Sequence, residues 1–447
     1  MQNTPPSTQM FKKVVESTPK ILTCCAQGFV HLRYAQPSDG DINDLSRGLS
    51  SSAHDVEETD LNRYLDRPRS YVEVVQSFLF LYVFARLRCL FIAMAPSFLI
   101  NYYYNTKPKE LRKTLFLDGL RGYASFIVVI FHLEVIEPHD QWIREHWGTN
   151  EKDDLGSNIL QLPFIRVLFS GLPMVTCFFL ISGFVLSYRN VQLIRSGEYE
   201  KLSESVTSLI FRRGFRLFLP SIAGILLQRV LLPWMYWNPP STQTMMNDVY
   251  NETSMLLNHW SFDDHNMKLG HLWTIPVEFT CFVVLFVVIV GVARLGTWVR
   301  LSVVGALIMH SNASGHWAVA LFMIGLFLAE CEEIIEEQKG IQEAGAWIGK
   351  RERWISRLQS LFWITVFLAG LYLAGYPERF VDKSHDYSWI YLYTPQVYVD
   401  MGEPLPVMFW VSAASTLVVV ALLRLSALQK AFTTPVAQYL GDISYSI

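Results

Sequence analysis

Long apolar segments recur along the chain after residue 113, and short polar stretches separate them. They cover residues 116–136, 165–188, 215–237, 273–293, 298–310, 315–330, 359–375 and 406–424, and another begins near Pro435. A helix needs about 20 apolar residues to cross a bilayer, and several segments approach that length, although the fifth is short enough to be half a helix. The pattern predicts an all-α fold, a polytopic transmembrane helical bundle with about 9–11 membrane helices in the full protein. Because the chain stops at Ile447 within the last segment, we expect it to be C-terminally incomplete.

The first 104 residues differ from this pattern. Residues 1–70 are predicted to be a disordered cytoplasmic tail, because Gln36–Ser70 is rich in Ser, Asp, Gly and Arg and has few apolar residues. Residues 71–104 are apolar but are interrupted by two arginines and Pro96. This favours an interfacial helix, with a re-entrant pair or a span with buried arginines as alternatives. The membrane domain is then expected to cover residues 113–447.

Charge is distributed unequally between the polar stretches, which predicts the topology. Lys and Arg gather before the first apolar segment, between the second and third, before the seventh and after the eighth. The positive-inside rule places these stretches in the cytoplasm. Glu137–Asp154 is mostly acidic, and Asn238–His271 is almost free of Lys and Arg and carries a glycosylation triplet at Asn251. These features favour a multi-pass protein of the endoplasmic reticulum or the plasma membrane.

Composition agrees with a membrane protein. The chain is 51% hydrophobic and only 17% charged, whereas soluble domains contain about 25% charged residues. A net charge of −3 gives no reason to expect nucleic acid as a partner. The six cysteines are scattered, and their spacing suggests neither a metal site nor a disulfide framework.

The first apolar segment contains three ionisable side chains, Asp118, Arg121 and His132. In a helix, Arg121 and His132 fall on nearly the same face, about 16 Å apart along the axis, and Asp118 lies within reach of Arg121. Ionisable groups at membrane depth are costly, so they indicate a functional site. The alternative is that Arg121 extends to a lipid headgroup and His132 is solvated at the other interface.

The stretch Phe211–Pro220, FRRGFRLFLP, carries Arg212, Arg213 and Arg216 at the expected cytoplasmic mouth of the third span. Simple anchoring by positive charge would explain one or two of them. Arg212 and Arg216 lie four residues apart on one helix face, and a planar guanidinium suits phosphate oxygens. A clamp for the phosphates of coenzyme A is therefore a second interpretation.

Two other stretches place unusual residues inside apolar segments. CFFLISGFVLS, Cys177–Ser187, contains Ser182 next to a glycine, and small residues there are typical of close helix packing. GHLWTIPVEF, Gly270–Phe279, places Glu278 one turn inside the fourth span, near its lumenal start. A carboxyl group at that depth needs a partner.

The order of these motifs resembles the acyltransferase-3 family of integral membrane acyltransferases. LDGLRG…FH, FFLISGF, RRGFRLFLP, LWTIPVEF and LGDISYSI follow one another from Lys113 to Ile447, and WTIPVEF is most similar to the fungal branch. In the last motif, Ser444 and Tyr445 are expected to be packing residues. The family's last motif normally continues into another helix, whereas this chain ends there.

The resemblance implies transfer of an acyl group, commonly acetyl, from acetyl-CoA or another acyl-CoA to a hydroxyl of a small-molecule, sugar or lipid acceptor. Arg121 and His132 match the family's essential Arg-x10-His pair, and Glu278 matches its W-x4-E carboxylate. Our hypothesis is that Arg121 helps to hold the donor and His132 is the general base, with the acceptor entering from the lumenal side. An acyl-enzyme on Ser182 or His132 is not supported by any nucleophile–base spacing.

Three other interpretations are weaker. A transporter would use the intramembrane ionisable groups as a relay, but no repeated pair of broken helices is visible in the sequence. The membrane-bound O-acyltransferase class, MBOAT, would place its His in a late span, and here it lies in the first. A purely structural membrane protein has no use for so many ionisable groups inside its apolar segments.

Overall fold

The computed structural model describes residues 114–136, 158–231, 241–258, 272–343, 350–379, 381–384, 386–402 and 404–444, and the side chains of 134–136, 230–231, 339–343 and 350–356 are left aside. These residues all belong to one unit of the chain, Leu111–Ile447. The predicted tail, residues 1–70, and the predicted interfacial segment, residues 71–104, lie outside the described residues.

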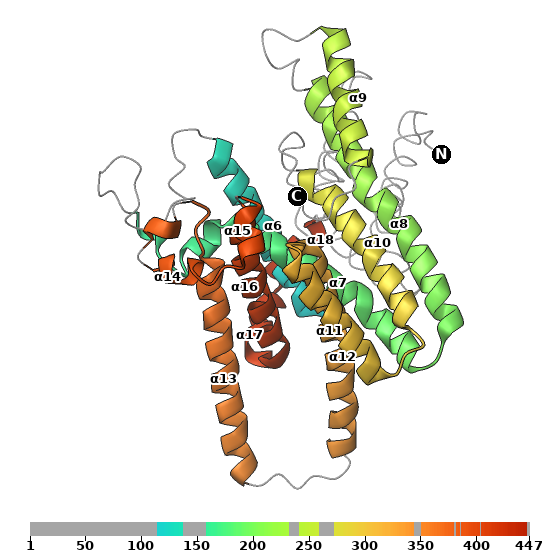
Figure 1. Ribbon diagram of the computed structural model, residues 1–447, viewed down its shortest axis with the longest axis vertical. Coiled ribbons are helices and arrows are strands. Elements are labelled where there is room, and N and C mark those ends of the chain that lie inside the picture. The colour runs from blue at the N-terminus through green and yellow to red at the C-terminus, as the bar shows by residue number, and fades with distance from the viewer. Residues whose placement is uncertain are drawn as a thin grey trace, which may run out of the picture. The chain divides into compact units, whose positions relative to one another are not determined.

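Helices form throughout the described part of the chain, which contains no strand (Figure 1). The long ones are α6 (Leu115–Ile136), α7 (Gly171–Arg195), α8 (Tyr199–Leu226), α10 (Thr274–Val292), α11 (Thr297–Ala313), α12 (Trp317–Glu343), α13 (Lys350–Ala374) and α16 (Leu405–Arg424). Among the described residues, five helices are long and apolar enough to cross a membrane, namely α6, α7, α10, α13 and α16. The predicted all-α membrane bundle is confirmed.

Helix α7 lies at the centre of the bundle and packs against α6, α12 and α16, while α13 covers the outer side of α16 (Figure 1). Helices α7 and α12 run in the same direction, because Phe179 contacts Trp317 near their starts and Arg195 contacts Glu337 near their ends. Between these points the backbones touch at Gly183, where an added Cβ would lie 2.7 Å from the carbonyl oxygen of Phe322. The sequence predicted that the small residues of this stretch serve close helix packing, and Gly183 does so between α7 and α12.

Replacing Gly183 with alanine is expected to lower the free energy of unfolding by about 1–3 kcal/mol, because the Cβ meets backbone atoms that cannot rotate away. Gly291 on α10 is a matched control, since an added Cβ there has no neighbour within 4 Å. Thermal unfolding in detergent would compare Gly183→Ala with Gly291→Ala. Equal midpoints for the two variants would contradict the close contact of α7 with α12.

Two predictions about the third span and the loop after it are wrong. The third span was expected at residues 215–237, but α8 begins at Tyr199 and ends at Leu226, followed by a π-helical turn, Leu227–Leu231. The predicted loop contains helix α9 (Thr242–Asn258), which packs on the end of α8 (Figure 1). The glycosylation triplet falls in α9, where Asn251 is exposed and the hydroxyl of Thr253 is buried.

Helix α8 is polar at its start and apolar further along. Its first ten residues, YEKLSESVTS, reduce its hydropathy, whereas Phe211, Phe215 and Leu219 form an exposed apolar stripe along the helix. The guanidinium of Arg294, just after α10, lies 5.9 Å from the ring of Tyr199. The start of α8 is therefore level with the end of α10, and the two helices run in opposite directions.

Shorter elements connect and cover these helices. They are η2 (Ile159–Gln161), η3 (Arg166–Phe169), η7 (Val381–Lys383), α14 (Ser388–Tyr391), α15 (Gln396–Asp400), α17 (Ser426–Phe432) and α18 (Pro435–Ile443). Of these, α18 packs extensively on α6, although it comes more than 300 residues later in the chain. This contact brings the last motif of the sequence to the first.

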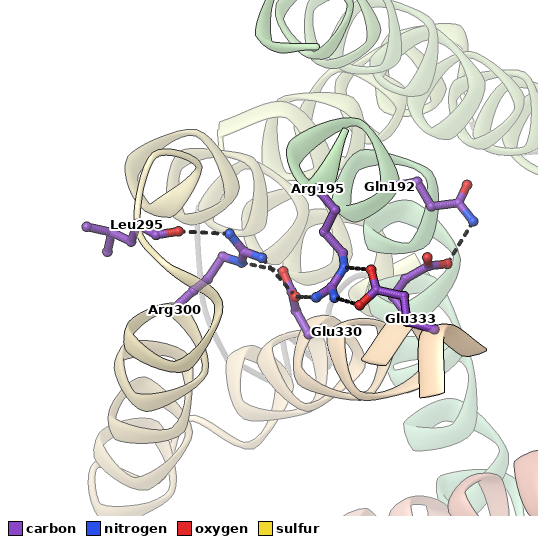
Figure 2. Close-up of polar contacts among 7 residues, drawn as sticks. Gln192, Arg195, Leu295, Arg300, Glu330 and Glu333 are labelled. Carbon is purple, nitrogen blue, oxygen red and sulfur yellow. Dashed lines mark hydrogen bonds and ion pairs between the residues drawn. The ribbon is translucent and has the colours of Figure 1, made fainter. Parts of the chain in front are cut away.

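A buried ion network joins α7, α11 and α12 (Figure 2). Arg300 pairs with the carboxylate of Glu330 through its Nε and Nη2, the latter at 3.0 Å, and its Nη1 donates to the carbonyl of Leu295 at 3.0 Å. Arg195 lies 3.5 Å from the same carboxylate and also pairs with Glu337. Arg300 and Glu330 are only 3% and 1% exposed. Arg300 therefore depends on Glu330 for compensation of its charge, whereas Glu330 lies beside both Arg300 and Arg195.

Candidate active site

Three polar side chains from three helices meet inside the bundle. Arg213 on α8 forms an ion pair with Glu278 on α10. Ser182 on α7 donates to Glu278 Oε1 at 3.4 Å and accepts from Arg213 Nη2 at 3.4 Å. The guanidinium carbon of Arg213 also lies 5.3 Å from the ring centre of Phe282, close enough for a cation–π contact. We call Ser182, Arg213 and Glu278 the central cluster.

The central cluster supplies the partner that Glu278 was expected to need. Arg213 and Glu278 are both about one-fifth exposed, so the pair is largely withdrawn from solvent and its charges interact more strongly than at a surface. The Nε of Arg213 is buried and has no hydrogen-bond partner within the described part of the chain. A buried donor without a partner is costly.

The three arginines of α8 were expected at the cytoplasmic mouth of the span, and Glu278 near the lumenal start of α10. The structure instead places Arg213 level with Glu278, about 20 Å along α10 from the end that lies beside Tyr199. Arg212 and Arg216 are exposed, and Arg212 Nε donates to the carbonyl of Ser208 at 3.2 Å. Arg213 instead turns inward, so the three guanidinium groups do not form one cluster.

Arg121 on α6 is half-buried, and its Nη2 donates to the hydroxyl of Ser444 at 3.2 Å. Ser444 follows α18 in the last motif and was expected to be only a packing residue. Both residues could be picked out from the sequence. The sequence does not indicate, however, that two positions 323 residues apart share a hydrogen bond.

His132 lies near the other end of α6 and is exposed, with its ring edge-on to Phe131 at 5.6 Å between centroids. Phe131 packs on Gly171, the first residue of α7, where an added Cβ would lie 2.5 Å from the Phe131 ring. Because the end of α6 meets the start of α7, the two helices run in opposite directions. Arg121 and Ser182 are each about 15 Å along their helices from this contact, so they lie at a similar depth, whereas His132 lies beside it.

The described side chains thus give two polar centres at one depth, the central cluster and the Arg121–Ser444 pair, with His132 about 16 Å further along α6. In the part of the chain that the structure describes, no group of three or more His, Cys, Asp or Glu side chains could hold a metal ion.

Comparison with protein families decides the class. Residues 114–447 match the acyltransferase domain of the acyltransferase-3 family, which covers most of the chain and all of the described residues. The chain belongs to the acyltransferase-3 family. It is therefore an integral membrane acyltransferase, and the alternative of a transporter loses its support.

Three fungal proteins are similar to this acyltransferase. "O-acetyltransferase PaAT-1" of Phomopsis amygdali is 29% identical over 51% of this chain and 50% of its own length. "Acyltransferase clz18" of Cochliobolus lunatus is 24% identical over 77% of this chain, and "Acyltransferase R4" of a Phoma species is 22% identical over 76%. The match spans only half the length of PaAT-1 but 82% of each of the other two. No solved structure matches the chain.

Acyl transfer to a hydroxyl requires groups with particular chemical roles, and the side chains described above are able to fill them. Transfer to a hydroxyl needs a base that removes the proton, and an imidazole such as that of His132 is suited to this. It also needs positive or donor groups near the oxygen that becomes negative, and near the donor's own charges. Arg121 and Arg213, held by Ser444 and Glu278, are cations already fixed in direction.

Proposed function

We propose that this acyltransferase moves an acyl group, acetyl in the first instance, from an acyl-CoA to a hydroxyl of a small-molecule, sugar or lipid acceptor. The observation that carries the proposal is the common depth of Arg121 and the central cluster, with His132 on the same face of α6. The name of the relative PaAT-1, an O-acetyltransferase, supports acetyl as the group transferred.

In this proposal Arg121 helps to hold the acyl donor, and His132 accepts the proton of the acceptor hydroxyl as its oxygen attacks the thioester carbonyl. Proton transfer and attack give the ester and the thiol of coenzyme A, with the proton passing from His132 to the sulfur. The long pantetheine arm of coenzyme A separates its phosphates from its thioester. Side chains that bind the phosphates therefore need not lie next to the general base, which agrees with the 16 Å rise between Arg121 and His132.

We assign different tasks to the three arginines of α8. Arg213 is already paired with Glu278, so we propose that the pair contributes a fixed dipole to the site. In this proposal Glu278 is the carboxylate that activity requires. Arg212 and Arg216 are exposed, four residues apart on α8. Their guanidinium groups are suited to the phosphates of acyl-CoA.

We also propose a location and a topology for this acyltransferase. The unequal charge of the connecting stretches favours a cytoplasmic donor and a lumenal acceptor in the endoplasmic reticulum or the plasma membrane. Helix α6 carries Arg121 near its start and His132 near its end. This order agrees with a donor that approaches from one side of the membrane and an acceptor that approaches from the other.

The proposal is tested by transfer of label from radiolabelled acetyl-CoA in membranes that contain the protein. We expect label to enter an extractable product, and alkaline hydrolysis to release it as acetate if the product is an ester. Membranes without the protein are the control. If purified protein neither transferred label nor bound acetyl-CoA, the choice of donor would be wrong, and the same assay with longer acyl-CoA thioesters would show whether only the chain length was misjudged.

Arg212→Ala and Arg216→Ala are each expected to raise the KM for acetyl-CoA about tenfold with little change in kcat, because each removes a charged hydrogen bond to the donor phosphates. Lys201→Ala is the matched control, since this basic residue is also on α8 and is 66% exposed. Initial rates at varied acetyl-CoA would measure the three KM values. Similar KM values in all three variants would rule out phosphate binding by Arg212 and Arg216.

A further inference from the structure

The last described helix, α18, is fixed on α6 by direct backbone contact. An added Cβ on Gly122 would lie 2.4 Å from the amide nitrogen of Gly441, and one on Gly441 would lie 2.5 Å from the carbonyl oxygen of Asp118. The side chain of Gln438 donates to the carbonyl of Leu115 at 3.0 Å. With no side chains between the two backbones and a hydrogen bond across them, the register of α18 against α6 is set.

This register places the end of α18 over Arg121. Arg121 Nη2 donates to the hydroxyl oxygen of Ser444 at 3.2 Å, and the same hydroxyl donates its own proton to the carbonyl of Gly441 at 2.7 Å. The hydroxyl therefore has a fixed direction and offers a lone pair to the guanidinium.

We propose that Ser444 is a positioning residue for Arg121 and thereby for the acyl donor. Ser444 accepts a hydrogen bond from Nη2 of Arg121, which fixes the direction in which the guanidinium faces the donor. This assignment rests on the proposed role of Arg121 in holding that donor. It also gives the glycines at 122 and 441 a functional reason, because any side chain there would move Ser444 away from Arg121.

The first test is the KM for acetyl-CoA of Ser444→Thr and Ser444→Val. The two new side chains have nearly the same shape, and only threonine keeps the hydroxyl. We expect threonine to preserve the KM within about twofold and valine to raise it about tenfold, with kcat changed much less. Equal KM values for these two variants would overturn the proposal, whatever their effect on stability.

Thr434→Ala separates positioning from mere stability. The hydroxyl of Thr434 caps the start of α18 by accepting from the amide of Ala437 at 3.3 Å, and it lies at the opposite end of the helix from Ser444. We expect Thr434→Ala to lower the thermal midpoint without raising the KM for acetyl-CoA. An equal rise in KM from Thr434→Ala and Ser444→Val would mean that α18 matters only as a structural support.

The second test is a double-mutant cycle with Arg121→Ala. We expect Arg121→Ala alone to raise the KM, and Ser444→Val to add nothing to it. If Ser444→Val raised the KM by the same factor in both backgrounds, Ser444 would not act through Arg121 and the proposal would fail while the role of Arg121 stood. If Arg121→Ala left the KM unchanged, the proposed role of Arg121 in holding the donor would be wrong. The proposed role of Ser444 in positioning the donor would then be wrong as well.

Discussion

His132→Ala is expected to lower kcat for acyl transfer about 10²–10⁴-fold, the usual contribution of a positioned general base. The KM for acetyl-CoA should change little, because His132 is about 16 Å along α6 from Arg121, which we assign to the donor. His132 is exposed and packs edge-on against Phe131. The loss of its ring should therefore leave the fold intact, so that the change in rate reports on chemistry.

His310→Ala is a suitable control for this experiment. His310 is also exposed, in the last turn of α11, and its removal should leave the rate of label transfer unchanged. Single-turnover rates at saturating acetyl-CoA would compare the two variants directly. A near wild-type rate for His132→Ala would show that another group removes the proton, and it would leave Arg121 and Ser444 as a donor site without an assigned base.

Most of the bundle could be predicted because membrane helices are recognised from local sequence. The apolar segments at 116–136, 273–293 and 406–424 correspond to α6, α10 and α16 with ends that agree within one or two residues. Length and hydropathy are enough there, since each helix must satisfy its own backbone hydrogen bonds inside a bilayer.

The same reasoning fails for α8 and α9 for a physical reason. The first half of α8 is polar, and α9 has almost no net hydropathy, so neither has the apolar length that marks a span. Their stability comes from contacts with other helices, such as the packing of Ile225 against Leu256. An apolar run that appears to start at residue 215 is only the second half of a longer helix.

The residues of the candidate site could be named from the sequence, but their partners could not. Arg213 and Glu278 were expected near opposite faces of the membrane, and the structure pairs them. The depth of a residue in a bundle depends on where its helix begins and in which direction the helix runs. Because the start of α8 was predicted too late in the sequence, Arg213 was predicted to lie near the beginning of the helix. Ser182 and Ser444 were judged as packing residues, because the sequence does not show which side chain a small hydroxyl faces.

Glu330→Gln is expected to lower the free energy of unfolding by about 3–5 kcal/mol, the usual cost of leaving one partner of a buried ion pair without the other. Glu330 is 1% exposed and holds Arg300, which is 3% exposed, and it also lies 3.5 Å from Arg195 (Figure 2). A neutral amide could keep one hydrogen bond but would not balance either charge. Arg195 keeps Glu337, so most of the cost falls on Arg300.

Glu337→Gln is the matched control, because this carboxylate belongs to the same network but is 56% exposed. Water screens an exposed pair, so we expect a loss of less than about 1 kcal/mol. Denaturant unfolding in a fixed detergent would measure both variants. If both lost the same small amount, water would have to reach Glu330, and the network would not be buried as described.

The double variant Arg300→Met with Glu330→Met tests what the network is for. Replacing a buried pair by apolar side chains of similar size is often neutral or stabilising, so this variant should recover most of the stability that Glu330→Gln loses. If it recovers stability but transfers label more slowly, the network is kept because it fixes how α11 and α12 sit against α7, the helix that carries Ser182 into the central cluster. If both stability and transfer return to wild-type values, the charges of the network are needed for neither, and the apolar contacts between the helices are enough to hold α7 in place.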